Sequence, residues 1–91
     1  MGYRVTILAP AEKAIAKLDK PQRERAIHFL KDELPGLADP RSIGGALTGN
    51  LGEFWKYRRG ALRFICRIED DELVILVVKI GNRKDVYKAK Q

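Results

Sequence analysis

The sequence predicts an α+β fold in which a helix hairpin packs on a mostly antiparallel four-stranded sheet. Three observations lead to this prediction. An alternating, partly β-branched segment opens the chain, two segments with helical periodicity follow it, and three strand-like segments separated by tight turns come last. The expected order is β-α-α-β-β-β. With 91 residues and one cysteine, we expect a single domain, residues 1–91, held together by packing and not by disulfides.

The first half of the chain predicts one strand and two helices. Residues 3–8 (YRVTIL) alternate as a strand does, and Pro10 can open a helix as its first residue. Asp19 can cap a second helix, with Pro21 as its opener and Pro35-Gly36 as its end. The apolar stripe expected for the first helix is Ala11, Ala14, Ile15 and Leu18, and that for the second is Ala26, Ile27, Leu30 and Leu34.

The second half predicts three strands, over residues 54–59, 62–69 and 73–80. Gly60-Ala61 and Asp70-Asp71 are the expected turns between them, and Gly81-Asn82 is expected to end the last strand. Residues 35–52, rich in glycine and proline, connect the helices to these strands. A connection this long is unusual in a compact domain and is often functional. It lacks the Lys and Ser/Thr of a phosphate-binding P-loop.

The turn at Gly60-Ala61 sets the expected register of the first hairpin. A two-residue tip pairs Arg59 with Leu62 and Arg58 with Arg63, so that two arginines lie directly opposite each other. Like charges at such a pair are destabilising, which favours a site for an anion. One face then carries Trp55, Tyr57, Leu62, Phe64, Cys66 and Ile68, and the other carries Lys56, Arg58, Arg63 and Arg67. The alternative is an ordinary solvent-exposed sheet face with no ligand.

The net charge of +6 is unevenly distributed along the chain. Residues 1–53 hold 8 Lys/Arg against 7 Asp/Glu, whereas residues 54–91 hold 10 against 5. This asymmetry indicates a polyanionic partner, either nucleic acid or an acidic protein, unless the surface is merely solvated. Arg83, Lys84 and Tyr87 follow the last strand and extend the basic region. The sequence shows neither a membrane-spanning run nor a signal-peptide pattern, so we expect a cytoplasmic protein.

Other candidate sites have simpler explanations. His28 shares its helix face with charged residues and is expected to be solvated, and Cys66 falls on the core face as a small buried hydrophobe. The acidic run 69–72 spans a tight turn and is expected to be solvated. The sequence contains no Cys/His cluster for zinc, and we expect neither a metal nor a small-molecule cofactor.

A more specific pattern runs through the second half of the chain. Residues 47–51 (LTGNL), 55–58 (WKYR) and 80–87 (IGNRKDVY), together with Gly60 and Arg63, resemble the RelE branch of the RelE/ParE toxin superfamily. The element order and length are also similar to this family, whose fold is the RelE-like microbial RNase fold. The resemblance implies a toxin of a type II toxin–antitoxin system, neutralised by a cognate antitoxin protein. RelE-type members cleave mRNA in the ribosomal A site, with the 2′-hydroxyl attacking the adjacent phosphate.

The resemblance also implies roles for individual residues. Lys56 and Arg63 match the phosphate-binding positions, Arg83 the acid for the leaving group or the stabiliser of the transition state, and Tyr87 the aromatic that orients the base. The implied catalytic set is Lys56, Arg58, Arg63, Arg83 and Tyr87. The residues expected to contact RNA phosphate are Lys56, Arg58, Arg63, Arg67 and Lys84.

One position departs from the family pattern. Arg58 stands where RelE-type enzymes often place a lysine base, and an arginine is effectively always protonated. Either Lys56 takes the proton, or the enzyme relies on electrostatic stabilisation and ribosomal RNA groups, or catalysis is weak or absent. The alternative activity is that of the ParE branch, a non-enzymatic inhibitor of DNA gyrase. A third reading is a basic binding module whose partner is the antitoxin alone.

Overall fold

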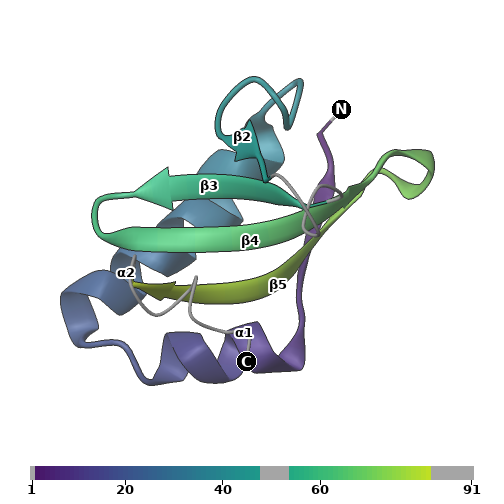
Figure 1. The fold of residues 1–91 in the computed structure, drawn as a ribbon. Coiled ribbons are helices and arrows are strands. Elements are labelled where there is room, and N and C mark those ends of the chain that lie inside the picture. The colour runs from purple at the N-terminus through teal and green to yellow at the C-terminus, as the bar shows by residue number, and fades with distance from the viewer. Residues whose placement is uncertain (1, 48–53, 83–91) are drawn as a thin grey trace.

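The computed structural model describes residues 2–47 and 54–82, and it has the predicted α+β architecture (Figure 1). The sheet has five strands in the order β1-β5-β4-β3-β2, with β1 parallel to β5 and the other pairs antiparallel. The elements are β1 (Arg4–Ile7), α1 (Ala9–Ala16), α2 (Lys20–His28), β2 (Gly45–Ala46), β3 (Trp55–Arg59), β4 (Leu62–Glu69) and β5 (Val74–Asn82). The predicted number of four strands was therefore too low, because β2 forms inside the segment expected to be a loop.

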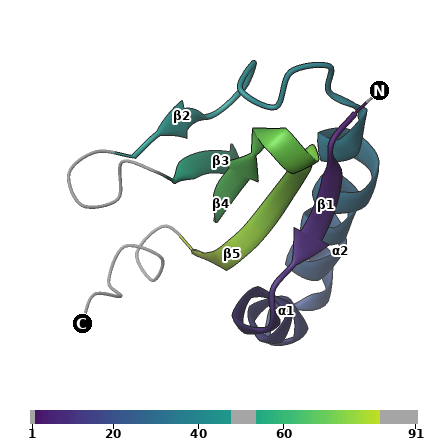
Figure 2. The same ribbon diagram turned by 90° about the vertical axis from the view of Figure 1, so that its right-hand side faces the viewer.

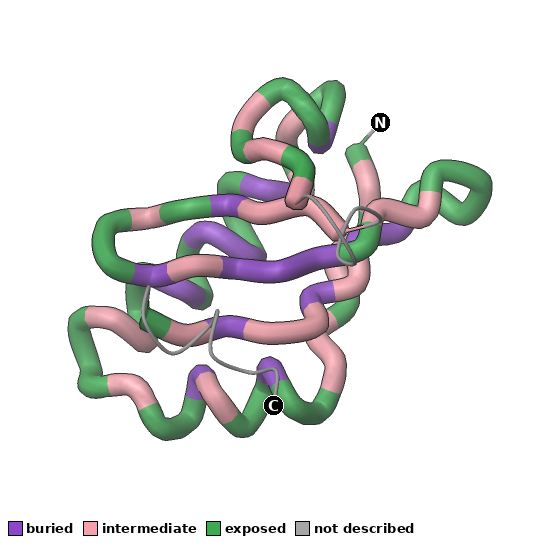
Figure 3. The backbone as a smooth tube through the Cα atoms, viewed as in Figure 1, coloured by how far each residue is buried: buried purple, intermediate pink, exposed green. Residues whose placement is uncertain are grey.

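Both helices lie on one side of the sheet, where they bury a single core. Figure 2 shows α1 end-on and α2 rising behind β1. Figure 3 shows the buried positions along the middle of β4 and on the inward sides of the helices. None of the helices within residues 2–47 and 54–82 is long and apolar enough to cross a membrane.

The first strand and helix follow the sequence pattern. Burial alternates along β1, and Val5 and Ile7 pack against the core. Pro10 lies in the first turn of α1, where its missing N–H costs no hydrogen bond. The predicted stripe is confirmed, since Ala11 and Ile15 are buried and Ala14 and Leu18 pack partly against the core.

The second helix begins as predicted. The Asp19 carboxylate accepts a hydrogen bond from the backbone N–H of Gln22 at 3.1 Å, which is an N-cap. The helix continues through a π turn over Phe29–Glu33 and a 3-10 turn over Leu34–Gly36, so it ends at the expected Pro35-Gly36.

One residue of the predicted apolar face of the second helix was wrong. Ile27 is 37% exposed, whereas Phe29, which was not predicted, is 1% exposed. The buried positions Ala26, Phe29 and Leu30 follow an i, i+3, i+4 pattern, which leaves Ile27 outside the stripe. The Phe29 ring packs against Phe64 with a centroid distance of 4.9 Å, so the helix phase is fixed by an aromatic contact with the sheet.

The first hairpin has the predicted register. Arg59 pairs with Leu62 and Arg58 with Arg63, and the tip residue Gly60 has a φ of +59°. Side chains of the predicted inward face are buried or pack against the core, and those of the predicted basic face lie on the side of the sheet away from the helices. We call that side the outer face.

The last strand departs from simple alternation and does not end at Gly81. Ile65 of β4 pairs with Lys79, but the next residue, Cys66, pairs with Val77, so Val78 is an extra residue in a β-bulge. Strict alternation from Val77 would point Lys79 into the core. The bulge shifts the phase, so Lys79 lies opposite Ile65 on the outer face, and the strand continues to Asn82.

Candidate functional site

A cleft of about 730 Å³ opens where β2 meets β3 at the edge of the sheet. We call it the basic cleft. Its lining includes two glycines and four basic residues, namely Gly44, Gly45, Lys56, Arg58, Arg59 and Arg63. The structure therefore brings together Lys56, Arg58 and Arg63, which were predicted from the sequence. It also adds a wall, formed by residues 43–47, that the sequence did not predict.

Glycines flank the basic side chains in the sheet. Lys56 of β3 pairs with Gly45 of β2, and Arg63 of β4 lies between Arg58 of β3 and Gly81 of β5. Cross-strand partners point to the same face, so a side chain at either glycine would stand beside a basic residue. An ideal Cβ built on Gly45 has no atom within 4 Å. Gly45 therefore leaves open space next to Lys56.

Among the residues that the structure describes, no carboxylate compensates the charge of the two opposed arginines. The Nη1 of Arg63 donates to the carbonyl oxygens of Gly60 at 2.9 Å and Leu62 at 3.2 Å, which fixes the guanidinium near the hairpin tip. Within the described residues, no acidic side chain pairs with Arg58 or Arg63. Such a pair of like charges is stabilised when an anion binds between or beside them.

Two aromatic residues of β3 hold the cleft wall. The Tyr57 hydroxyl donates to the carbonyl oxygen of Pro40, and Trp55 Nε1 donates to the carbonyl oxygen of Ile43 at 2.8 Å. Tyr57 is fully buried, and burial raises the pKa of its hydroxyl, which therefore stays protonated as a donor. These bonds place the segment that leads into β2.

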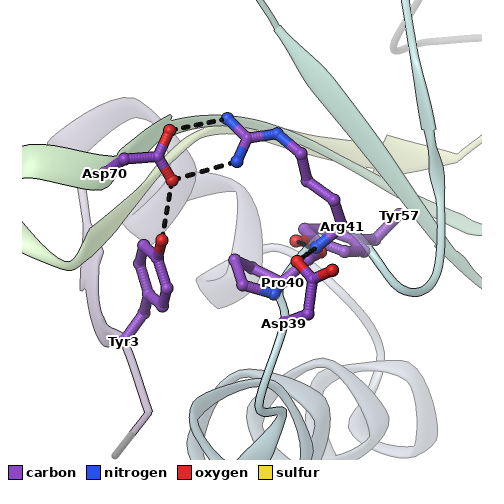
Figure 4. A network of polar contacts seen from close by, with 6 residues as sticks. All are labelled: Tyr3, Asp39, Pro40, Arg41, Tyr57 and Asp70. Atoms are coloured by element: carbon purple, nitrogen blue, oxygen red, sulfur yellow. Dashed lines mark hydrogen bonds and ion pairs between the residues drawn. The ribbon is translucent and has the colours of Figure 1, made fainter.

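An ion pair from the far end of the sheet supports the same wall (Figure 4). Arg41 donates from both terminal nitrogens to the Asp70 carboxylate, at 3.0 and 3.1 Å, and the Tyr3 hydroxyl donates to Asp70 at 2.6 Å. The hydrogen bonds from Arg41, and next the one from Tyr3, lower the pKa of the Asp70 carboxyl. The acidic turn was expected to be only solvated. In the structure one of its residues anchors a loop 29 positions away in the sequence.

Gly44 explains part of the glycine content of the connecting segment. Its φ is +83°, and an ideal Cβ there would lie 2.3 Å from the Lys56 carbonyl oxygen and 2.7 Å from Trp55 Nε1. Only glycine allows this close approach without a shift of the backbone. The wall can therefore lie directly against β3.

The structure separates Arg67 from the other predicted phosphate ligands. Arg67 shares the outer face but pairs with Glu69 at 3.2 Å, and it does not line the basic cleft. Arg59, which the sequence did not single out, lines the cleft, and its guanidinium pairs with Glu33 at 3.0 Å. The predicted residues Arg83, Lys84 and Tyr87 lie outside the described residues.

The remaining candidates do not line the basic cleft. Cys66 is buried as predicted, and burial raises the pKa of its thiol to about 12. His28 is exposed as predicted, with its Nδ1 3.0 Å from an Asp32 carboxylate oxygen. Across the described part of the chain, no three His, Cys, Asp or Glu side chains gather as metal ligands would.

Comparison with known proteins identifies a toxin family and solved structures that this chain resembles. A family model described as the ParE toxin of the type II toxin–antitoxin system parDE matches residues 5–87. The chain is 25% identical over 88 residues to the toxin RelG of Mycobacterium tuberculosis, a match that covers 97% of this chain and 99% of that protein.

Solved structures show the same fold. The chain is similar to a chain of the toxin–antitoxin complex RelBE2 of Mycobacterium tuberculosis, with a TM-score of 0.83, 23% identity, and coverage of 91% of this chain and 93% of that one. It is also similar to a chain of the archaeal RelE–RelB complex of Pyrococcus horikoshii, with a TM-score of 0.69, 31% identity, and coverage of 91% and 97%. The fold is RelE-like.

Proposed function

Because this chain belongs to the RelE/ParE toxin family of type II toxin–antitoxin systems, we propose that it is a ribosome-dependent endoribonuclease whose basic cleft binds mRNA. The observation that supports this proposal is the convergence of Lys56, Arg58 and Arg63 on one cleft, with no acidic partner for either arginine among the described residues. Arginine suits the role because its planar guanidinium can donate to two phosphate oxygens at once.

The chemistry follows from where negative charge develops. The 2′-hydroxyl loses its proton and attacks the adjacent phosphorus, the bond to the 5′-oxygen breaks, and that oxygen takes up a proton. The products are a 2′,3′-cyclic phosphate and a 5′-hydroxyl. The phosphorane that forms during the attack carries extra negative charge. Arg63 and Arg58 stabilise this charge from fixed positions on the hairpin. Arg83 as a stabiliser of the transition state and Tyr87 as the aromatic that orients the base complete the proposed site, and the departing 5′-oxygen takes its proton from water.

The base for the first step is a residue other than Arg58. An arginine keeps its proton at any physiological pH, so Arg58 acts as a positive charge and not as a base. Lys56 is half-buried in the cleft lining, and its side chain would act as the base in its unprotonated form. We assign it this role. If it does not act, groups of the ribosomal RNA take its place.

We also propose a cognate antitoxin as the protein partner. The related chains from Mycobacterium tuberculosis and Pyrococcus horikoshii are found in toxin–antitoxin complexes, the latter with RelB. A toxin with a net charge of +6 attracts an antitoxin of opposite charge over a distance. The association rate is then expected to fall as the salt concentration rises.

A second candidate is the inhibition of DNA gyrase, because the matching family model is that of the ParE toxin. Primer extension on mRNA in a cell-free translation reaction, run beside a gyrase supercoiling assay, separates the two candidates. The endoribonuclease produces codon-phased cuts that disappear when ribosomes are left out. Inhibited supercoiling with intact mRNA would establish the gyrase inhibitor instead.

A further inference from the structure

The tip of the β3–β4 hairpin has an arginine on each side. On the outer face, Arg63 donates to the Gly60 carbonyl oxygen at 2.9 Å. From α2, the guanidinium of Arg25 lies against the same glycine, since an ideal Cβ on Gly60 would be 2.5 Å from Arg25 Nη1 and 3.7 Å from its Cζ. The absence of a side chain at Gly60 is what admits Arg25.

The cations at this tip are unequally neutralised. Arg59 pairs with Glu33 at 3.0 Å, and its guanidinium lies 4.5 Å from the centre of the Phe29 ring. Arg25 and Arg58 are exposed, and within residues 2–47 and 54–82 neither has an acidic partner. The positive surface of the basic cleft therefore continues around the hairpin tip onto α2.

The surroundings of the tip favour nucleic acid over protein as the partner. Protein interfaces are anchored by large apolar and aromatic side chains, but the tip itself is Gly60-Ala61. Ile27 and Leu73 are the exposed large hydrophobic residues of the described chain. Ile27 is two residues beyond Arg25, roughly 200° around the helix, and Leu73 follows the other turn of the sheet. Exposed arginines without an apolar anchor fit a phosphodiester backbone.

We propose that Arg25 is a phosphate contact outside the basic cleft, so that an RNA backbone bound at Arg63 continues around the hairpin tip to α2. This inference rests on the proposed function, because it extends the same RNA-binding surface. The phosphate that Arg25 contacts belongs either to the message or to ribosomal RNA. Both offer the same chemistry.

The test measures how binding depends on salt. The variant Arg25→Gln removes the charge and keeps most of the side-chain length, Arg25→Lys keeps the charge, and Lys13→Gln on α1 is the matched control. Each protein is titrated against a 2′-O-methyl RNA oligonucleotide, ribosomes without message, and ribosomes programmed with a message whose A-site codon is 2′-O-methylated. Thermal unfolding shows that each variant is folded.

One lost phosphate contact reduces the slope of log affinity against log salt by about 0.7–0.9. Between about 50 and 200 mM salt, wild-type affinity should therefore fall roughly 2.5- to 3.5-fold more than that of Arg25→Gln. Arg25→Lys and Lys13→Gln should keep the wild-type slope. A changed slope with the oligonucleotide assigns the phosphate to the message, and a change with ribosomes alone assigns it to ribosomal RNA.

Three results would overturn the inference. The slope of Arg25→Gln could equal that of the wild type, Lys13→Gln could change the slope equally, or Arg25→Gln could weaken only the binding of the antitoxin. The last result would make the hairpin tip a protein interface. If the wild-type protein binds none of the three RNA probes, the proposed function fails, and this inference fails with it.

Discussion

Two arginines of β4 form a matched pair for testing the basic cleft. Arg63 and Arg67 are four residues apart on the same face of the same strand. Arg63 lines the cleft and has no acidic partner among the described residues, whereas Arg67 pairs with Glu69 and lies outside the cleft. Replacing either by alanine changes the net charge equally. The comparison of Arg63→Ala with Arg67→Ala therefore distinguishes the effect of a position in the cleft on mRNA cleavage from the effect of net charge.

The expected losses of stability are small for both variants. Arg63→Ala removes two hydrogen bonds to backbone carbonyls near the hairpin tip, and it also removes the repulsion with Arg58 on the neighbouring strand. These effects oppose each other, so we expect a change in unfolding free energy within about 1 kcal/mol. Arg67→Ala breaks a solvent-exposed ion pair with Glu69, which is worth roughly 0–1 kcal/mol.

The expected losses of activity differ. A preorganised donor that meets developing negative charge contributes roughly 3–4 kcal/mol to transition-state stabilisation, so Arg63→Ala should cut mRNA about 10²- to 10³-fold more slowly. Arg67→Ala should cut at close to the wild-type rate, because its guanidinium already pairs with a carboxylate outside the cleft. Both variants should bind the antitoxin and unfold near the wild-type temperature.

Cleavage rates are measured by primer extension in a cell-free translation reaction, and folding by thermal unfolding. Undiminished cleavage by a folded Arg63→Ala protein would refute the assignment of the cleft. Equal losses in the two variants would show that overall charge, and not the cleft, drives activity. An Arg63→Ala protein that fails to fold would show that Arg63 is structural.

Three further predictions test the cleft and its wall. Gly45→Val places a side chain in open space beside the basic residues, so mRNA cleavage should fall by about 10-fold or more at unchanged thermal stability; full activity would mean that RNA does not enter there. Tyr57→Phe leaves the buried Pro40 carbonyl without its donor, which should lower the unfolding free energy in urea by about 1–3 kcal/mol, and an unchanged midpoint would contradict this. Hydrogen bonds from Arg41 lower the pKa of Asp70, so its stabilising contribution is complete above the ordinary pKa of 3.8 and is lost as the pH falls through the lowered value. Between pH ~5 and ~2, the free energy of unfolding should therefore fall less for Asp70→Asn than for the wild type. Denaturation measured at several pH values checks this, and an equal fall in the two proteins would count against the ion pair.

Local sequence patterns determined most of the elements and one complete register. Asp19 caps the second helix because an N-cap needs only its own first turn, and Gly60-Ala61 fixes the hairpin because a two-residue tip decides every pair that follows it. The opposition of Arg58 and Arg63 was thus predictable from spacing alone. The family resemblance carried by the second half of the chain is likewise a property of the sequence, and the matching family model supports it.

The bulge in β5 and the phase of the second helix depended on tertiary contacts. Alternation alone cannot show that Val78 is an extra residue, because the shift becomes visible only against the paired strand β4. The burial of Phe29 in place of Ile27 follows from the aromatic residues of the sheet against which it packs. Both features arise from neighbours that are distant in the sequence.

The cleft itself was decided by the tertiary structure. Three of its four cations were predicted from the sequence, but its wall was not, because hydrogen bonds between residues far apart in the sequence hold the wall in place. Pro40 is bound by a tyrosine 17 residues away, and Arg41 by an aspartate 29 residues away. The same contacts bring Gly45 beside Lys56 and form the cleft. The sequence by itself thus determined which residues carry the charge and that Glu69 lies beside Arg67 on the same face of one strand, whereas only packing between distant segments decided that Arg63 faces a cleft.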